Sequence, residues 1–322
     1  MVSRCGIIGL GKIGMMYDLA IDKTKAVYTH CRSLSIHPNF EIAFAVDPLS
    51  SQREIFSQNY KKPVYVDLES ASKEGNIDVA VIANNTSAHF ETIKQLLNHF
   101  EPKVILCEKP LTYNVSESFK IIDLCKKRNI NLFVNYMRRA DPAVIEIKNR
   151  IISGAIKRDI KGVAWYSKGF LHNGSHFFNI LEFWLGPLVD FNIINSGRSL
   201  DNGDAEPDVC VEFEKGEIVF IAAWEEVFSH YTIELLSSSG RLRYDSGGNY
   251  ISWQKVINHP TLFQYKVLDN NPEVIVNEMD YYQICVLDQL SFFLEGKSHT
   301  LCTGDEAMTT LINMDRILKE RK

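Results

Sequence analysis

A short apolar stretch near the start of the chain runs straight into a glycine turn, and this junction constrains the fold more than any other feature. Residues 5–8 are apolar, and Gly9, Gly11 and Gly14 follow with the spacing G-x-G-x-x-G. Such a turn needs its first glycine for the tight bend, its second for close approach of an anionic ligand, and its third for packing of a helix on the strand. The pattern predicts the first strand, turn and helix of a parallel sheet.

A second apolar segment, residues 41–46, ends at Asp47. A carboxylate there suits the ribose hydroxyls of NAD and repels the 2′-phosphate of NADP, while the glycine turn, including Lys12 and Ile13, offers N–H groups to the pyrophosphate. The usual spacing to this acid is about 20 residues, so residues 17–39 must hold extra loop or helix. We predict NAD as the cofactor, with NADP less suited; a glycine turn that serves packing alone is the alternative.

Composition narrows the class of protein. The 322 residues are 45% hydrophobic and carry a net charge of −5 without a basic tract, so binding to nucleic acid or to a membrane surface is not expected. The N-terminal residues form a core strand that contains Arg4 and do not resemble a leader. Seven cysteines are scattered through apolar runs, which is typical of reduced, buried thiols. We expect a globular cytoplasmic protein.

The chain divides into two patterns. Residues 1–137 alternate apolar strands with amphipathic helices, which predicts a doubly wound parallel sheet of the Rossmann type. Residues 138–322 predict an α+β domain with a large, open, mainly antiparallel sheet, a hairpin at Lys215-Gly216 and a C-terminal helix, 305–320, that packs back on the first domain. The expected strands of this sheet include residues 163–167, 189–195, 209–213, 218–224, 231–236, 241–244 and 263–267. An open sheet needs its bare face covered, so we expect a homo-oligomer, a dimer or tetramer, that pairs through it.

Two further motifs give the chain a family resemblance. Cys107-Glu108-Lys109-Pro110 ends the predicted fifth strand, and Gly174-Ser175-His176 precedes a predicted helix over residues 177–185. Together with the glycine turn, the motifs resemble those of the glucose-fructose oxidoreductase, inositol dehydrogenase and MocA family (Gfo/Idh/MocA). The resemblance implies an NAD-binding Rossmann domain, a second domain with a mixed sheet that carries the substrate, an active-site lysine at Lys109 and a histidine at His176.

The same resemblance extends to the loops around the cofactor. Residues 134–139 match the family's strand-to-linker segment, and His89 matches a histidine after the third strand. Asn84 and Asn85 stand where many relatives have a Thr-Pro pair. We therefore assign Asn84, Asn85, His89, Glu108 and Lys109 to the cofactor site, beside the glycine turn.

Lys109 and His176 carry the chemistry that such a site needs. A lysine at a partly dry site can hydrogen-bond a substrate hydroxyl and stabilise the alkoxide as hydride leaves, and an imidazole can carry the proton. The non-functional alternatives are a solvated lysine in a loop and a histidine whose ring is hydrogen-bonded to backbone groups. Tyr136, Arg138 and Lys168 add an aromatic ring and two cations that suit a hydroxylated or anionic sugar, although part of this set is expected to be packing.

Besides Asn84 and Asn85, the chain departs from the family at two positions around His176. Family members carry aspartates where this sequence has His172 and Asn179. His172 and His176 are spaced like zinc ligands on a helix, but Asn173-Gly174 between them disfavours regular helix and no third ligand is evident, so no metal is predicted. We assign His172 a catalytic or substrate-contacting role beside His176.

These observations predict an NAD-dependent oxidoreductase that moves a hydride between nicotinamide and a secondary alcohol or ketone of a sugar or nucleotide-linked sugar, for instance in polysaccharide biosynthesis. Two alternatives remain. NAD-assisted glycoside cleavage would regenerate the cofactor in each turnover. A sensor or partner protein would bind NAD and a sugar without turnover, which the lost aspartates favour and the intact Lys109 and His176 oppose.

Overall fold

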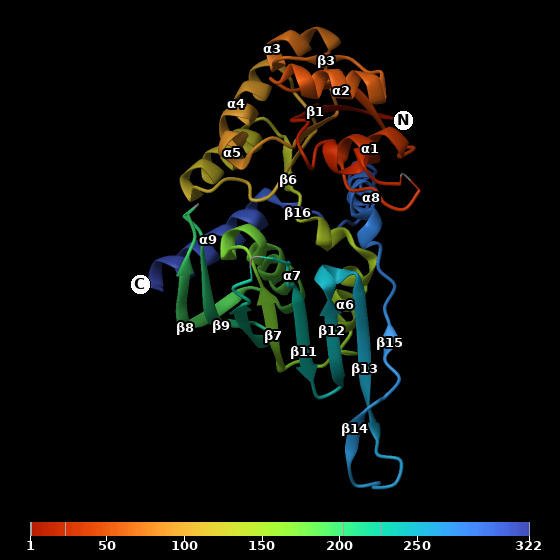
Figure 1. Cartoon of the computed structure of the whole chain (residues 1–322), viewed down its shortest axis with the longest axis vertical. Coiled ribbons are helices and arrows are strands. Elements are labelled where there is room, and N and C mark those ends of the chain that lie inside the picture. Colours follow the sequence, from red (N-terminus) through yellow and green to blue (C-terminus); the bar gives the residue numbers. More distant parts are fainter. Residues whose placement is uncertain (1, 23, 202, 226, 322) are drawn as a thin grey trace. The chain divides into compact units, whose positions relative to one another are not determined.

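A computed structural model describes residues 2–22, 24–201, 203–225 and 227–321 of the chain (Figure 1). It contains two compact units. Unit 1 comprises Met1–Ala140 and Asp280–Thr309, and unit 2 comprises Asp141–Met279 and Thr310–Lys322. The division after Ala140 lies three residues beyond the one expected from sequence (140 against 137), and residues 280–309, expected in the second domain, group with unit 1.

The described part of unit 1 contains a seven-stranded sheet in the order β16-β6-β5-β4-β1-β2-β3. All of its neighbouring strands are parallel except β16, which pairs antiparallel with β6. Its strands are β1 (Ser3–Ile8), β2 (Phe40–Val46), β3 (Val64–Tyr65), β4 (Val79–Ile82), β5 (Val104–Cys107), β6 (Asn131–Val134) and β16 (Cys302–Thr303). The order from β3 to β6 is that of the Rossmann fold, so the chain reverses its winding between β1 and β4, where ligands bind in such sheets.

Alternation along the strands gives this sheet two apolar faces, each covered by helices. Cys5 and Ile7 pack with α1 (His30–Ile36), α2 (Ser50–Tyr60) and α8 (Tyr282–Leu294). Ile8, on the opposite face, packs with α3 (Leu68–Ala71), α4 (His89–His99) and α5 (Val115–Lys127). Because both faces are buried, the strands are continuous apolar runs, and this is why they were predictable.

In the described residues of unit 2, a second sheet has the order β14-β13-β12-β11-β7-β10-β9-β8, with β15 paired to β13. The sheet is antiparallel apart from the β7–β10 pair, which is parallel. Its strands are β7 (Ile160–Tyr166), β8 (Leu188–Ser199), β9 (Ala205–Phe213), β10 (Gly216–Ala222), β11 (Thr232–Ser237), β12 (Gly240–Asp245), β13 (Tyr250–Asn258), β14 (Lys266–Leu268) and β15 (Glu273–Val274).

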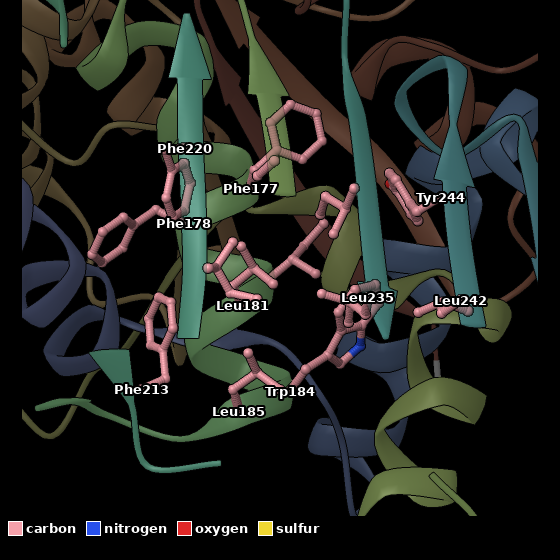
Figure 2. Packing of buried hydrophobic residues seen from close by; sticks show 14 of the residues in the cluster. Phe177, Phe178, Leu181, Trp184, Leu185, Phe213, Phe220, Leu235, Leu242 and Tyr244 are labelled. Atoms are coloured by element: carbon pink, nitrogen blue, oxygen red, sulfur yellow. The ribbon is translucent and has the colours of Figure 1, made fainter. Parts of the chain in front are cut away.

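One face of this sheet carries the core of unit 2. Helix α7 (Ser175–Leu185) lays Phe177, Phe178, Leu181 and Trp184 across it, against side chains from β9 to β12 (Figure 2). Helix α6 (Pro142–Ile152) packs on the same core, as do Met314 and Ile317 of α9 (Gly304–Glu320). The buried aromatic rings meet edge to face or stacked, which adds to the free energy of burial.

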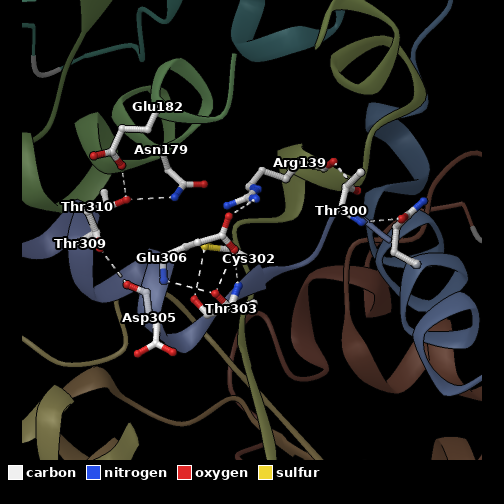
Figure 3. Close-up of polar contacts among 11 residues, drawn as sticks. Arg139, Asn179, Glu182, Thr300, Cys302, Thr303, Asp305, Glu306, Thr309 and Thr310 are labelled. Carbon is white, nitrogen blue, oxygen red and sulfur yellow. Dashed lines mark hydrogen bonds and ion pairs between the residues drawn. The ribbon is translucent and has the colours of Figure 1, made fainter. Parts of the chain in front are cut away.

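Polar contacts in unit 1 fix the start of α9. Thr303 and Glu306 form a capping box, in which the Glu306 N–H donates to the Thr303 hydroxyl and the Thr303 N–H donates to the Glu306 carboxylate (Figure 3). The buried Arg139 pairs with the other Glu306 oxygen at 2.7 Å. The segment after β6 is thereby tied to β16 and α9 within unit 1.

Several expected elements differ in the structure. Residues 263–267 were expected as a strand, but β14 begins only at Lys266, and β13 was missed. The helix expected from residue 177 begins at Ser175, and the turn before it, Phe170–Gly174, is a π-helix (η5). Asn173-Gly174 was expected to disfavour regular helix between His172 and His176. The backbone there is helical but is a π-helix, wider than an α-helix, and it leads directly into α7. In the described part of the chain, no helix is both long and apolar enough to cross a membrane.

Candidate active site

The glycine turn lies at the carboxyl end of β1 and fits a dinucleotide pyrophosphate. Gly9 has a φ of +102°, and a Cβ there would lie 2.4 Å from the Asn84 backbone nitrogen. A Cβ on Gly14 would lie 2.2 Å from the Gly9 carbonyl oxygen, whereas one on Gly11 would meet no atom of the described residues within 4 Å. The outer glycines are thus required by packing. The open space over Gly11 suits a group that approaches the backbone closely.

The segment between this turn and β2 holds the extra structure that the spacing predicted. A 3-10 helix (η1, Met16–Leu19) and a loop precede α1. The start of α1 lies against the turn, because the Cys31 N–H donates to the Gly14 carbonyl at 2.9 Å. The buried Asp18 holds this helix start by accepting from the Thr29 N–H and hydroxyl at 2.8 and 2.7 Å.

Asp47 follows β2, as predicted, and is buried beside the glycine turn. One carboxylate oxygen accepts from the Leu10 N–H at 2.8 Å and the other from the Leu49 N–H at 2.9 Å. A carboxylate offers about four lone-pair positions, so these two bonds leave capacity for ribose hydroxyls. Asp47 also braces the turn itself, a role that the motif did not predict. Arg53 of α2 donates to the Asp47 carbonyl at 2.8 Å and brings a cation close to this acid.

The loops after β4 and β5 meet over His89. Asn84 donates to Thr92 at 2.7 Å, and its side-chain oxygen is buried with no hydrogen-bond partner among the described residues. The fully buried His89 ring lies within hydrogen-bond distance of the Asn84 carbonyl (Nε2, 3.1 Å) and the Leu111 carbonyl (Nδ1, 2.9 Å). Burial lowers the pKa of His89 despite these bonds. His89 thus positions two loops of the site, and Asn85 is exposed beside it.

Glu108 is held by a second cluster at the end of β5. His30 Nε2 lies 2.7 Å from Glu108 Oε1, and the Asn135 amide donates to the same oxygen at 2.8 Å. Burial alone would raise the pKa of Glu108. The hydrogen bond and charge of His30, the Asn135 bond and the charge of Lys109 outweigh burial and lower the pKa. Glu108 is therefore a carboxylate at neutral pH.

The remaining predicted residues of unit 1 lie at the same sheet edge. Lys109 follows Glu108, is half-buried, and is joined to Pro110 by a cis peptide bond. Tyr136 follows β6 and is buried in the core of unit 1, while Arg138 is half-buried. The side-chain oxygen of Asn135 is buried without a hydrogen-bond partner in the described residues. With Asn84, it offers an unused acceptor to a ligand at this edge.

In unit 2 the predicted histidines lie on η5 and α7. His172 is exposed on the π-turn, and His176, in the first turn of α7, is nearly buried. The Asp204 carboxylate holds the turn by accepting from the N–H groups of Leu171 at 3.0 Å and His172 at 2.9 Å. Gly169 precedes the turn with a φ of +96°, and a Cβ there would lie 2.2 Å from Asp204.

Further contacts in unit 2 support the segments before and after these histidines. Glu206, buried and paired with Arg198 at 2.5 Å, accepts from the Gly169 N–H at 3.0 Å. Lys168 is exposed with a positive φ of 61°. Asn179 lies in the buried part of α7 and donates to the Thr310 hydroxyl at 3.0 Å, so it anchors α9 (Figure 3).

Sequence reasoning missed His30, Asp204 and Glu206. Each acts on a segment distant in sequence, 78 residues away for His30 and Glu108 and 32 for Asp204 and His172. The described residues contain no group of three or more His, Cys, Asp or Glu side chains that could hold a metal ion.

A family model matches the first part of the chain. Residues 3–136 match the model of the Gfo/Idh/MocA oxidoreductase family, described as having an NAD-binding Rossmann fold. The matched residues hold the glycine turn, Asp47 and Glu108-Lys109-Pro110. The match agrees with the predicted family and NAD cofactor over these residues, and the predicted fold class is confirmed.

Individual relatives extend the comparison. The chain is 27% identical over 245 residues to scyllo-inositol 2-dehydrogenase (NAD(+)) of Bacillus subtilis, covering 66% of this chain and 64% of that one. It is 27% identical to an inositol 2-dehydrogenase/D-chiro-inositol 3-dehydrogenase of Lactiplantibacillus plantarum, covering 49% of this chain. The match spans less than two thirds of either relative (64% and 42%).

A solved structure shares the whole fold. The WlbA dehydrogenase of Bordetella pertussis, crystallised with NADH and UDP-GlcNAcA, superposes with a TM-score of 0.75 over 99% of this chain and 97% of that chain, at 16% identity.

Proposed function

We propose that this Gfo/Idh/MocA chain is an NAD-dependent dehydrogenase or reductase that acts on a secondary alcohol or ketone of a polyol, a sugar or a nucleotide-linked sugar. The observation that carries the proposal is the glycine turn, open over Gly11, at the same sheet edge as Glu108 and Lys109. The inositol dehydrogenases among its relatives and the UDP-sugar bound to a structural neighbour support this substrate class.

The cofactor is assigned to unit 1. The N–H groups of the glycine turn, including those of Lys12 and Ile13, hold the pyrophosphate. Asp47 accepts from the ribose hydroxyls, and the loops of Asn84, Asn85 and His89 border the nicotinamide end. Bound NAD supplies the ring that takes up or releases hydride.

Lys109 and His176 carry the polar steps. The Lys109 ammonium donates to the substrate oxygen and stabilises the negative charge that builds there as the carbon–hydrogen bond breaks. His176 takes the hydroxyl proton during oxidation and returns it during reduction. Tyr136, Arg138, Lys168 and His172 contribute to substrate binding.

The decisive experiment is a screen of inositols, free sugars and nucleotide-linked sugars with NAD, followed by NADH absorbance. With a substrate in hand, Lys109→Ala should lower kcat by about 10² or more and leave NAD affinity nearly unchanged, because the charge it stabilises exists only during hydride transfer. Lys103→Ala is the matched control, since Lys103 is an exposed lysine that pairs with Asp78. Equal turnover of both variants would make Lys109 a loop residue.

The two histidines should differ in role. His176→Ala should cost far more turnover than His172→Ala, which should act mainly on KM or on the pH profile. Activity should be lost on acidification, as the proton-accepting imidazole takes up a proton before the reaction begins. A larger loss in His172→Ala would exchange the two roles. If neither variant changes turnover, a non-catalytic NAD and sugar sensor gains support.

We further propose a cytoplasmic homo-oligomer that pairs through the bare face of the unit 2 sheet. That face carries partly exposed apolar side chains, including Val163, Trp165, Val219 and Leu236. All seven cysteines are outside disulfides, and six of them are buried, which agrees with a reducing compartment.

A further inference from the structure

The first residues of helix α1 contact both the glycine turn and the turn formed by Glu108-Lys109-Pro110. The His30 N–H donates to the Ile13 carbonyl at 3.2 Å, and the next residue, Cys31, donates to the Gly14 carbonyl at 2.9 Å. From the same position, the His30 ring reaches Glu108 Oε1 at 2.7 Å. One residue therefore contacts the glycine turn through its backbone and the turn that carries Lys109 through its side chain.

The surroundings make this contact rigid. His30 is 1% exposed, so its ring has little freedom to leave Glu108. Asn135, after β6, donates to the same carboxylate oxygen at 2.8 Å. Asp18 and Thr29 hold the helix start, because the buried Asp18 carboxylate accepts from the Thr29 hydroxyl at 2.7 Å and Thr29 caps α1 by accepting from the Arg32 N–H.

We propose that His30 is a positioning residue of the dehydrogenase site, which ties the Glu108-Lys109-Pro110 turn to the glycine turn so that NAD seating and the placement of Lys109 depend on each other. The inference rests on the proposed role of Lys109. His30 acts through Glu108, since the contact that the structure provides is with this carboxylate. A donor at Nε2, rather than the bulk of the ring, is what the tie requires.

The chain offers a matched control on the same helix. His37, the C-cap of α1, also places Nε2 near a carboxylate, that of Asp288 at 3.1 Å, and is also buried. Its partner lies on α8 rather than on the turn of Lys109. A substitution at His37 therefore removes a similar contact without breaking the tie.

Three variants separate the effect of the hydrogen-bond donor of His30 from the effect of its ring volume. His30→Phe keeps a ring without the donor, His30→Gln restores an N–H donor, and His37→Phe is the control. His30→Phe should lower kcat by about tenfold or more, because small misplacement of a reacting group is costly, and should weaken NAD binding measured by calorimetry by about threefold. The KM for the polyol or sugar should change by less than about threefold.

The other variants decide the interpretation. His30→Gln should recover kcat to within about threefold of wild type, and His37→Phe should leave kcat and NAD affinity within the same range. Loss in His30→Gln equal to that in His30→Phe, or equal effects of His30→Phe and His37→Phe, would overturn the proposal by reducing His30 to packing.

Hydrogen exchange tests the tie without turnover and separates it from the proposed function. In wild type, NAD should slow exchange in the peptide that contains Glu108 and Lys109, and His30→Phe should reduce this slowing. If no sugar or polyol is oxidised yet the slowing is lost in His30→Phe, the proposed function fails and the tie stands. If the slowing is unchanged in His30→Phe, the tie fails.

A readout on wild-type protein covers the case in which His30→Phe does not fold. The imidazole ¹⁵N resonances of His30 should shift when NAD is added, whereas those of His37 should not. Absence of a shift at His30 would also overturn the proposal.

Discussion

At the scale of single residues, Asp47 has two tasks that a motif treats as one. It accepts from the Leu10 and Leu49 N–H groups, and its place after β2 suits the ribose of NAD. The first task supports the glycine turn, and the second is the proposed selection of NAD over NADP. The two tasks can be separated because the first concerns folding and the second concerns ligand charge.

Asp47→Ala should narrow the preference for NAD over NADP by about tenfold, because repulsion of the 2′-phosphate is removed and Arg53 remains close. It should also lower the free energy of unfolding by about 1–3 kcal/mol, because two backbone N–H groups lose their acceptor. Isothermal titration with both nucleotides and urea unfolding measure the two effects. Glu54→Ala, which removes an exposed charge on α2, is the control and should leave the cofactor preference and the free energy of unfolding nearly unchanged. Tighter binding of NADP than of NAD by wild type would contradict the NAD assignment.

Glu108 should make unit 1 sensitive to acid. Its pKa is lower in the folded protein than the ordinary value of about 4.3, so the unfolded state binds the proton more readily. The resulting stabilisation is complete above the unfolded pKa and is lost as pH falls through the folded one. Urea unfolding of wild type between about pH 6 and pH 3 should show an acid loss that is smaller in Glu108→Gln. Parallel curves for the two proteins would contradict the pKa shift.

At the scale of elements, the π-turn η5 presents His172 and leads into α7. It depends on Asp204, whose carboxylate accepts two consecutive N–H groups, and on Gly169, whose missing Cβ makes room for that carboxylate. The family aspartate at position 172 is absent, yet Asp204 brings a carboxylate to the backbone of the same residue.

Asp204→Ala should destabilise this turn locally. Two buried or half-buried N–H groups lose their acceptor, which should cost about 1–3 kcal/mol and speed hydrogen exchange at Leu171 and His172. Asp201→Ala, an exposed aspartate in the preceding loop, is the control. Unchanged exchange in Asp204→Ala would mean that the turn holds itself.

Elements differed in how well their sequences predicted them. The strands β4 and β5 are apolar throughout, and β1 is apolar from Cys5 onward, because both sides of their sheet are covered. By contrast, β16 is two residues long and forms only because β6 offers an edge. The π-turn was not predictable either, since Asn173 and Gly174 have low helix propensity and the stabilising Asp204 lies 32 residues later, just before β9.

The candidate site shows the same division. Gly9 and Asp47 follow strands directly, and Lys109 lies two residues after β5, so local pattern predicts where they lie. His30 reaches Glu108 across 78 residues, and no local pattern reports such a contact. Asn179 was interpreted as a departure from the family's active site, but its amide donates to the Thr310 hydroxyl of α9. Residue type at a family position therefore predicts a contact only when the surrounding packing is also known.

At the scale of the whole molecule, the bare face of the unit 2 sheet is the region that should direct assembly. Trp165 stands on this face, with Val163 two residues earlier on β7. Trp165→Lys should shift the protein from oligomer toward monomer in light scattering, because a cation cannot be buried there without a partner. Phe263→Lys, at the exposed tip of the β13–β14 hairpin, is the control. A monomeric wild type would contradict the proposed assembly.

The distribution of thiols gives the protein a built-in reporter. Burial raises the pKa of the thiols of Cys5, Cys31, Cys107 and Cys125, which keeps them unreactive in the native state. Cys210, half-exposed on β9 opposite Val219, is the most accessible of the seven. A fluorescent maleimide should therefore label the native protein slowly and at Cys210 first. The rate at this position would follow self-association, and reaction of the other thiols would time the opening of the core.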